Sequence, residues 1–385
     1  MTNVSIIGLG ITPTGEHWET SLRHLGLEAI QAALADAHLA PAAIDTIVVG
    51  NALASSISDQ NHVGALLTDF AGMRGTESFR VEAADASGGI AVRQGAALIA
   101  SGMARTVLVL GVEKVTDVVG NLRQTAMATF LDSEYEAAQG ATPVSMMALL
   151  MRRYMMQYGI DLASFANFSV NAHANGNKNP KAMYRNLIKA DRFASAPVVA
   201  EPINLFDVAP EVDGAAAVIL TAADRAADLV PKPIRILASA AATDSLAVHD
   251  RREPLSLASV RIAAERAFEQ AKLTPKDIHV LELHDSATIM SVLALEAAGF
   301  APVGEGWKFA AENKIGLTGT LPISTFGGLK ARGNALGATG VYQVAEVALQ
   351  LRGDAGPNQV PEAKIGMAQN VGGTGGTAVV HILGA

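Results

Sequence analysis

The chain contains an internal repeat, and a duplicated chain is restricted to folds that set two similar units side by side. Residues 38–51, HLAPAAIDTIVVGN, align with residues 272–285, KLTPKDIHVLELHD, at one constant offset. The matching residues are Leu39, Pro41 and Ile44 in the first copy and Leu273, Pro275 and Ile278 in the second. A second register aligns AVRQ at residues 91–94 with GVYQ at residues 340–343, and it places Asp85 opposite Asn334. The repeat predicts two α/β halves whose helix N-termini point towards a common cleft.

The most informative stretch of the first half is residues 81–102, VEAADASGGIAVRQGAALIASG. A short strand pattern leads into a turn of small residues and then into an alanine-rich helix. The unpaired N–H groups and the dipole of a helix N-terminus favour negative charge. A nucleophile or a base is therefore expected at the apex of this turn, and the residue there is Asp85.

Composition excludes several classes of function. The net charge of −8 and the lack of any basic run argue against nucleic acid as the main partner. The chain has no cysteine, which excludes a disulfide framework, a thiolate metal site and a thiol nucleophile. The histidines show no metal-ligand spacing, so no metal site is predicted. No apolar run reaches membrane-spanning length and no signal segment opens the sequence, so a cytoplasmic protein is expected.

The pattern changes near residue 116, where helical spacing without a clear strand continues to about residue 204. We therefore predict a first half at residues 1–115, an inserted loop domain at 116–204, the end of the first half at 205–230, and a second half at 231–385. A methionine stripe marks the insert, consisting of Met146, Met147, Met151, Met155 and Met156. Core filling is the favoured interpretation, and an adaptable acyl pocket that includes Met147 is the alternative.

Several motifs together indicate a family. They are DASGG (85–89), LFDVAPEVDGAAAVIL (205–220), HDSAT (284–288), STFGGLKARGNALGATGVYQ (324–343) and AKIGMAQNVGGTGGTAVVHIL (363–383). With them the chain resembles the thiolase superfamily over nearly its whole length, and it is most similar to the sterol-carrier-type and archaeal-type thiolases. The resemblance implies a five-layer α-β-α-β-α fold of two pseudo-symmetric halves with an inserted loop domain. It also implies an acyl-CoA substrate, a role in lipid metabolism and a tight homodimer, possibly a dimer of dimers.

The chain departs from this family at its reactive positions. Members of this branch carry a nucleophilic cysteine where this chain has Asp85, and their His-Asp-Cys-Phe motif reads His284, Asp285, Ser286, Ala287 here. Their Gly-His-Pro motif reads Gly333, Asn334, Ala335, whereas Asn370, Val371 and Gly372 keep the form of the branch. Both thiols and the catalytic histidine are absent together, which indicates a remodelled site.

Enolate chemistry could survive this remodelling. Asn334 can donate an N–H where the family uses its histidine, His284 belongs to the motif that helps hold the oxyanion site, and the backbone N–H groups of Asp85 and Gly372 resemble the family's second oxyanion hole. Asp85 could act as a general base. Ser286, Met147, Asn370 and Gly333 are the expected substrate-binding residues.

A base that faces enolate-stabilising donors suits a retro-aldol cleavage, a decarboxylation or a hydration of an acyl-CoA. A carbon–carbon lyase of the retro-aldol type is favoured, with coenzyme A as the substrate carrier and no resident cofactor. Thiolase-like lyases of this kind work with a small zinc-ribbon and OB-fold partner, so such a partner is expected by resemblance. Two alternatives stay open. Asp85 and Asn334 could simply cap their helices, which would leave a catalytically inactive binding or scaffold subunit. An acyltransferase would need an unrecognised nucleophile.

Overall fold

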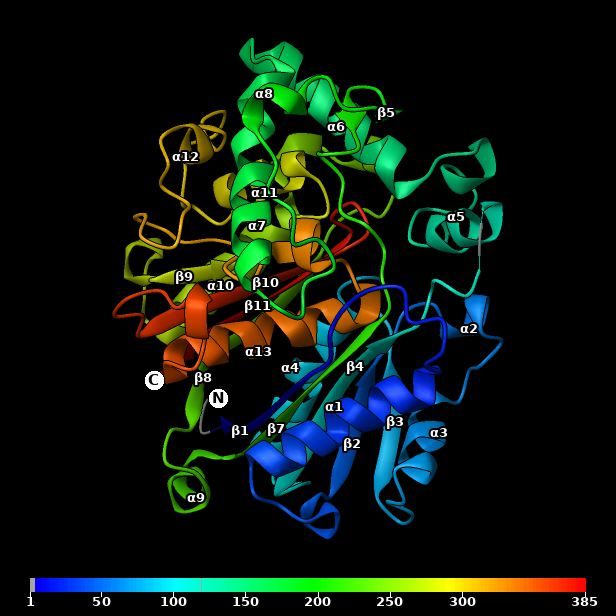
Figure 1. Ribbon diagram of the computed structural model, residues 1–385, viewed down its shortest axis with the longest axis vertical. Helices are drawn as coiled ribbons and strands as arrows, with labels where there is room; N and C mark the ends of the chain where they lie inside the picture. Colours follow the sequence, from blue (N-terminus) through cyan, green and yellow to red (C-terminus); the bar gives the residue numbers. More distant parts are fainter. Residues whose placement is uncertain (1–3, 119) are drawn as a thin grey trace.

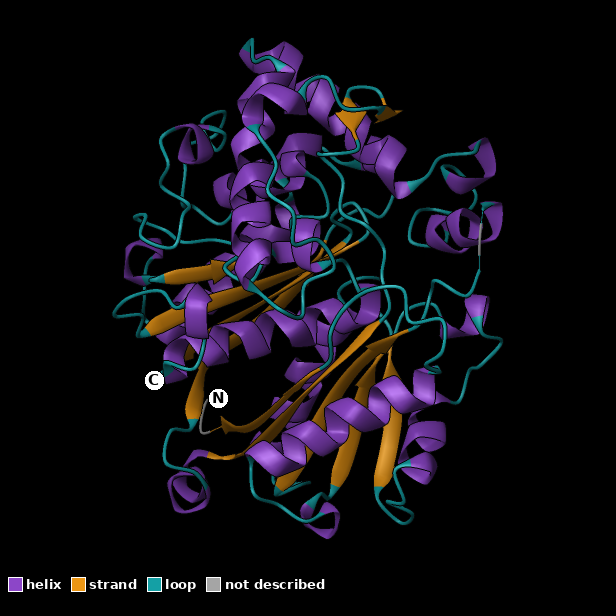
Figure 2. Ribbon diagram, in the orientation of Figure 1, coloured by secondary structure: helices purple, strands orange, loops and turns teal. Residues whose placement is uncertain are grey.

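The computed structural model describes residues 4–118 and 120–385 (Figure 1, Figure 2). In this part of the chain nine strands form one sheet in the order β3-β2-β4-β7-β1-β8-β11-β10-β9. The strands are β1 (Val4–Ile11), β2 (Thr46–Gly50), β3 (Glu77–Val81), β4 (Thr106–Glu113), β7 (Gly214–Ala222), β8 (Ile234–Thr243), β9 (Val280–Glu282), β10 (Ile365–Gly372) and β11 (Thr377–Gly384). The two halves of the sheet meet where β1 and β8 pair antiparallel at Ser5↔Arg235 and Ile6↔Ile234.

The two halves have the same topology, as the repeat predicts. Read outward from the junction, the first half runs β1-β7-β4-β2-β3 and the second runs β8-β11-β10-β9. An isolated parallel bridge between Leu281 and Ile323 takes the place of a fifth strand in the second half. The aligned repeat segments contain β2 and β9. Each of these strands follows a short 3-10 turn that begins at a proline. The chain is therefore a structural duplication as well as a sequence one.

Helices form three layers around the two half-sheets (Figure 1). Helices α4 (Ser87–Ala100) and α13 (Thr339–Arg352) lie between the half-sheets and contact each other and strands of both halves. On the outer faces, α1 (Leu22–Asp36) and α3 (Val63–Phe70) cover the first half, and α10 (Ala258–Ala271) and α11 (Thr288–Ala297) cover the second. This arrangement confirms the predicted five-layer α-β-α-β-α fold.

Glycine permits the close approach of the two central helices. A Cβ atom at Gly88 would lie 2.7 Å from the carbonyl oxygen of Gly337 and 2.9 Å from the backbone nitrogen of Val341. Those distances are shorter than van der Waals contact, so only a residue without a side chain fits there. The approach brings the turn before α4 and the turn before α13 together.

Most of the segment between β4 and β7 packs over the second half, whereas its first helix packs against Ala52 and Leu53 of the first half (Figure 1). It contains α5 (Asn121–Ala128), α6 (Pro143–Tyr158), α7 (Ala166–Lys178), α8 (Ala190–Phe193), β5 (Val198–Ala200) and β6 (Ile203–Asn204). The sequence predicted no strand here, yet β5 and β6 pair antiparallel. Of the methionine stripe, Met146, Met147 and Met151 are buried in a core shared with the second half, whereas Met156 is exposed. Most of the stripe therefore fills the core.

Three short helices complete the fold: α2 (Ala54–Ile57), α9 (Ala223–Leu229) and α12 (Lys308–Ala311). Among the residues described, no helix has both the length and the apolar character needed to cross a membrane.

Candidate active site

Asp85 and Asn334 are in direct contact. Asp85 lies in the turn between β3 and α4, Asn334 lies in the turn before α13, and Asn334 Nδ2 donates to Asp85 Oδ1 over 3.2 Å. Both residues are 5% exposed. Ala84, next to Asp85, has a φ of +51°, a conformation that an alanine rarely adopts. The two repeats therefore contribute one polar side chain each to a single buried pair, and the backbone beside it is strained.

The orientation of the Asn334 amide follows from its other contacts. Asn334 Oδ1 accepts from the backbone N–H of Leu336 (3.1 Å) and from Thr339 Oγ1 (2.8 Å). Because the oxygen already accepts from two donors, the NH₂ group is the end that faces Asp85. Asn334 therefore presents a fixed donor to the carboxylate. The hypothesis that it caps its own helix is wrong, because α13 begins after Ala338 without any side-chain cap.

The second oxygen of Asp85 accepts from a third segment of the chain. The backbone N–H of Gly373, in the turn between β10 and β11, donates to Asp85 Oδ2 over 3.2 Å. The neighbouring Gly372, whose N–H the resemblance assigns to an oxyanion hole, ends β10 and packs against the backbone of Ala83. The capping hypothesis for Asp85 is wrong, because α4 begins after Ala86 without any side-chain cap.

Burial controls the charge of this carboxyl group. Desolvation raises the pKa of Asp85 to about 6, against the opposing effects of the Asn334 and Gly373 hydrogen bonds. The negative charge of Glu211 raises the pKa further. Asp85 is therefore mostly ionised at neutral pH and still basic enough to accept a proton, which is the range that a general base needs.

Gly373 offers a sharp test of this turn. Its φ is +56°, and a Cβ atom would lie 2.8 Å from the carbonyl oxygen of Phe130. Gly373→Ala is expected to lower the free energy of unfolding by more than the ~1–2 kcal/mol of left-handed backbone strain alone, as measured by urea denaturation. Gly102→Ala is the matched control, because Gly102 has a φ of +75° and open space around it. Equal losses in the two variants would contradict the close contact with Phe130.

Glu113, which the sequence analysis did not single out, connects the two halves beside the pair. Its fully buried carboxylate accepts from the backbone N–H groups of Ala52 (2.8 Å), Leu53 (3.1 Å) and Gly337 (3.0 Å) and from Asn51 Nδ2 (2.8 Å). Burial raises the pKa of Glu113 to about 7. Since Gly337 follows Asn334 in the same turn, Glu113 holds that turn against the end of β2.

His284 and Asn370 form a second buried pair, one turn of α4 beyond Asp85. Asn370 Oδ1 accepts from the backbone N–H of Gly89 (3.1 Å), so its Nδ2 is the atom that donates to His284 Nδ1 (3.2 Å). Burial and the charge of Arg332 lower the pKa of His284 to about 3. The imidazole is therefore neutral with its proton on Nε2, and among the described residues no group accepts that proton.

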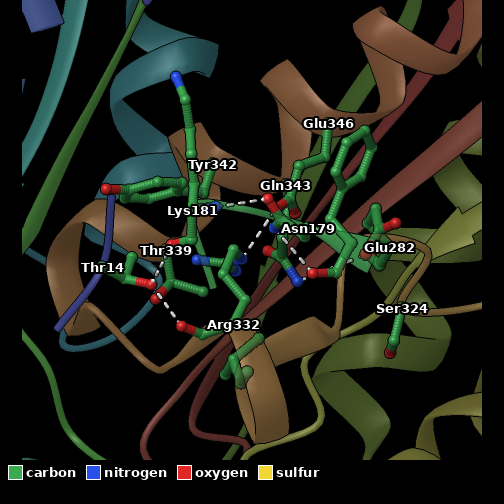
Figure 3. A network of polar contacts seen from close by, with 12 residues as sticks. Thr14, Asn179, Lys181, Glu282, Ser324, Arg332, Thr339, Tyr342, Gln343 and Glu346 are labelled. Atoms are coloured by element: carbon green, nitrogen blue, oxygen red, sulfur yellow. Dashed lines mark hydrogen bonds and ion pairs between the residues drawn. The ribbon is translucent and has the colours of Figure 1, made fainter. Parts of the chain in front are cut away.

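A buried ionic network surrounds Arg332, which shortly precedes Asn334 in the chain (Figure 3). Arg332 Nε lies 2.8 Å from Glu346 Oε1, and its guanidinium lies over the ring of Tyr342, 4.7 Å from the centroid. Thr14 Oγ1 donates to the carbonyl oxygen of Arg332. Gly333, with a φ of +115°, then turns the chain into Asn334. The network anchors the segment that carries Asn334.

Ser286 and Met147, both predicted to bind substrate, contact each other. Ser286 Oγ lies 3.5 Å from Met147 Sδ, and the carbonyl oxygen of Ser286 accepts from the backbone N–H of Ala209 (2.9 Å). Ser286 is 9% exposed and Met147 is 4% exposed. The pair lies where the insert, the second half and the segment before β7 meet.

A cavity of about 740 Å³ opens beside this junction. Its wall is mostly apolar, and its polar groups include Glu211, Lys330 and His173. Lys330 Nζ donates to the carbonyl oxygens of Leu205 (2.9 Å) and Val208 (2.7 Å), and burial lowers its pKa to about 8. Asp85 and Asn334 are not part of the cavity wall, but Pro210 is, and its carbonyl oxygen accepts from the backbone N–H of Asn334. The segment that carries Pro210 therefore connects the cavity wall to the polar pair.

Comparisons with known proteins agree with this architecture. The family model described as "Thiolase, N-terminal domain" matches residues 4–224, and the one described as "Thiolase C-terminal domain-like" matches residues 240–385. The chain is 44% identical over 382 residues to an acetyl-CoA acetyltransferase of Methanothermobacter thermautotrophicus, which covers 99% of both proteins. It is 30% identical to sterol carrier protein 2 of Homo sapiens, over 99% of this chain and 72% of that protein. A solved structure, the Ltp2-ChsH2(DUF35) aldolase, superposes with a TM-score of 0.87 at 25% identity, covering 100% of this chain and 98% of that one.

Proposed function

The chain belongs to the thiolase superfamily, and on that premise we propose that it acts on acyl-CoA thioesters as a carbon–carbon lyase of the retro-aldol type. The observation that carries the proposal is the buried Asp85 carboxylate, which receives hydrogen bonds from Asn334 Nδ2 and the Gly373 N–H at the position where the family has a cysteine. The chain has no cysteine, so a covalent thioester intermediate on a thiol of this chain is excluded. The likeness to a solved aldolase supports the same choice.

The proposed reaction cleaves a β-hydroxyacyl thioester. The hydroxyl group gives its proton to Asp85, the bond between the α and β carbons breaks, and the β carbon becomes a ketone or an aldehyde. The electron pair of the broken bond moves to the α carbon and the thioester oxygen as an enolate. Asn334, and His284 through its Nε2 proton, are the donors proposed for the enolate oxygen, each worth roughly 3–4 kcal/mol when well placed. The proton then returns to the α carbon, and a shorter acyl-CoA leaves.

The donor set also explains how Asp85 and the enolate share one site. While Asp85 is ionised, its carboxylate accepts the N–H groups of Asn334 and Gly373. Once Asp85 has taken the proton, the negative charge resides on the substrate, and those donors interact more strongly with the enolate than with a neutral carboxyl. The same N–H groups therefore stabilise the negative charge first on Asp85 and then on the enolate oxygen of the substrate.

The carrier and the partners belong to the same proposal. Coenzyme A is proposed as the substrate carrier, bound along the cavity of about 740 Å³, and no resident cofactor is required. A homodimer, possibly a dimer of dimers, is proposed from the family. The name of the superposed aldolase includes a second protein, ChsH2(DUF35), which supports a small zinc-ribbon and OB-fold partner for this chain as well.

A second candidate function is a catalytically inactive binding or scaffold subunit. This function is favoured by the burial of the polar pair, because Asp85 and Asn334 are each 5% exposed and do not line the cavity. An acyltransferase is a third candidate, because the chain shares 44% identity with a protein named as an acetyl-CoA acetyltransferase. That function would require a nucleophile other than a thiol.

One experiment separates the three candidates. The purified protein is incubated with matched β-hydroxyacyl-CoA and β-ketoacyl-CoA thioesters, with and without free coenzyme A, and the products are read by mass spectrometry. A lyase is expected to release a carbonyl compound and a shorter acyl-CoA from the hydroxy substrate without added coenzyme A. Cleavage of the keto substrate only when coenzyme A is added would identify an acyltransferase. Acyl-CoA binding by calorimetry without turnover would identify a scaffold subunit.

A further inference from the structure

Glu211 is the carboxyl group that links the cavity to the polar pair. It lies in the segment between β6 and β7, and its side chain belongs to the cavity wall, whereas that of Asp85 does not. Glu211 is mostly buried, and burial raises its pKa. A titratable group in the wall of an apolar cavity is in a position to exchange protons with a ligand there.

The backbone fixes the direction of the Glu211 side chain. Glu211 and Asn334 form an isolated parallel bridge, in which the N–H of Asn334 donates to the carbonyl oxygen of Pro210 (2.9 Å) and the N–H of Val212 donates to that of Asn334 (3.0 Å). Residues paired in a bridge project to the same face. Since the Asn334 side chain reaches Asp85, the Glu211 side chain lies on the Asp85 side of this segment and on the cavity side at once.

We propose that Glu211 is a further catalytic residue of the lyase reaction. In this refinement Glu211, in place of Asp85, receives the hydroxyl proton of the substrate in the cavity, and Asp85 exchanges the proton at the α carbon. The inference rests on the proposed lyase function. Retro-aldol cleavage moves two protons, one off the β oxygen and one onto the α carbon. A single carboxyl group would have to serve two separate atoms, whereas Asp85 and Glu211 together can serve one atom each.

The step balances with these two groups. Ionised Glu211 takes the hydroxyl proton, the bond between the α and β carbons breaks, and its electron pair forms the enolate. Protonated Asp85 gives its proton to the α carbon, which yields the shorter acyl-CoA and leaves Asp85 ionised and Glu211 protonated. Transfer of that proton from Glu211 to Asp85 restores the starting state, and no oxidant or cofactor is consumed.

The surrounding charges allow this division. The negative charge of Glu211 raises the pKa of Asp85 and so favours the protonated form of Asp85 while Glu211 is ionised. The positive charge of Arg123, on α5, lowers the pKa of Glu211 and favours its ionised form. The remaining titratable groups on this wall of the cavity are Tyr184, Lys330 and His173, of which burial lowers the pKa of His173 to about 4 and leaves it neutral.

The test compares Glu211→Gln with wild type and with Glu253→Gln, a change at an exposed glutamate. The substrate is the β-hydroxyacyl-CoA that the wild-type protein cleaves. Glu211→Gln is expected to lower kcat by about 10² to 10⁴ and to remove the acidic limb of the profile of kcat/KM against pH. Glu211→Asp is expected to restore part of the rate and the limb. An unchanged acidic limb in an active Glu211→Gln variant would overturn the role of Glu211 alone.

A second measurement needs no turnover. The stability difference between wild type and Asp85→Asn, followed by urea denaturation against pH, reports the ionisation of Asp85. In a Glu211→Gln background the midpoint of that change is expected to move to lower pH, because the neighbouring negative charge is gone. An unmoved midpoint would show that the Glu211 carboxylate does not lie beside Asp85 and would overturn the inference. A wild-type protein that cleaves none of the thioesters would overturn the lyase function and the catalytic role of Glu211 with it.

Discussion

Asp85→Asn is expected to slow the cleavage of a β-hydroxyacyl-CoA by a factor of about 10² to 10⁴, with little change in acyl-CoA affinity. The amide keeps the size of the side chain and can still accept from Asn334 Nδ2, but it cannot take up a proton at neutral pH. Single-turnover kinetics and calorimetry with the same acyl-CoA measure the two effects separately. An Asp85→Asn variant that cleaves at the wild-type rate would contradict any proton-transfer role for this residue.

Asp85→Asn is also expected to change how the free energy of unfolding depends on pH. Burial raises the pKa of Asp85 to about 6 from an ordinary 3.8, so between these values the native protein holds a proton that the unfolded chain has released. The stability of the wild type therefore falls as the pH rises through this window. The stability difference between the two proteins is expected to shift by about 3 kcal/mol between pH ~4 and pH ~8, in favour of Asp85→Asn. The effects of the Asn334 and Gly373 hydrogen bonds are already included in the pKa of Asp85, so the shift with pH reports the ionisation of Asp85.

Arg332→Met is expected to lower the free energy of unfolding by about 3–5 kcal/mol. Arg332 and Glu346 form an ion pair with each side chain 2% exposed, and Glu282 lies close enough for its pKa to depend on the charge of Glu346 (Figure 3). Removing the guanidinium leaves the Glu346 carboxylate buried without a cation. Urea denaturation at neutral pH measures the loss.

A double variant provides the control for that network. Arg332→Met combined with Glu346→Leu removes both members of the ion pair, and it is expected to be more stable than Arg332→Met alone because the buried Glu346 carboxylate is no longer left without its cation. The two stabilities would be equal if the ion pair contributed nothing and the loss came only from packing against Tyr342.

Much of the fold was predictable because the duplication of the chain is visible as an internal repeat in the sequence. The matched registers predicted two α/β halves, and the one that aligns Asp85 with Asn334 identified two side chains that are in contact at 3.2 Å. The family motifs predicted the layers and the insert. Helical spacing predicted that most of the methionine stripe is core, and the structure buries Met146, Met147 and Met151.

The remaining site residues were not predictable, for physical reasons. Glu113 acts through backbone N–H groups of Ala52, Leu53 and Gly337, which no side-chain pattern records. Glu211 matters through a bridge to Asn334 that depends on how an irregular segment lies against a turn. Gly373 donates to Asp85 from the turn that follows β10, and this contact depends on how that turn lies against the first half of the chain. The sequence offers one sign of the role of Glu113, which is a glutamate placed directly after the mostly apolar run at residues 106–112.

The central position of α13 has a consequence for biosynthesis. Nearly every residue of this helix is enclosed, and much of the enclosure comes from α4 and from strands that are translated long before it. During translation, the face of α4 that packs against α13 stays exposed until α13 has been synthesised near the end of the chain. The nascent chain therefore exposes an apolar surface for most of its synthesis, and we expect chaperones to bind it during that time.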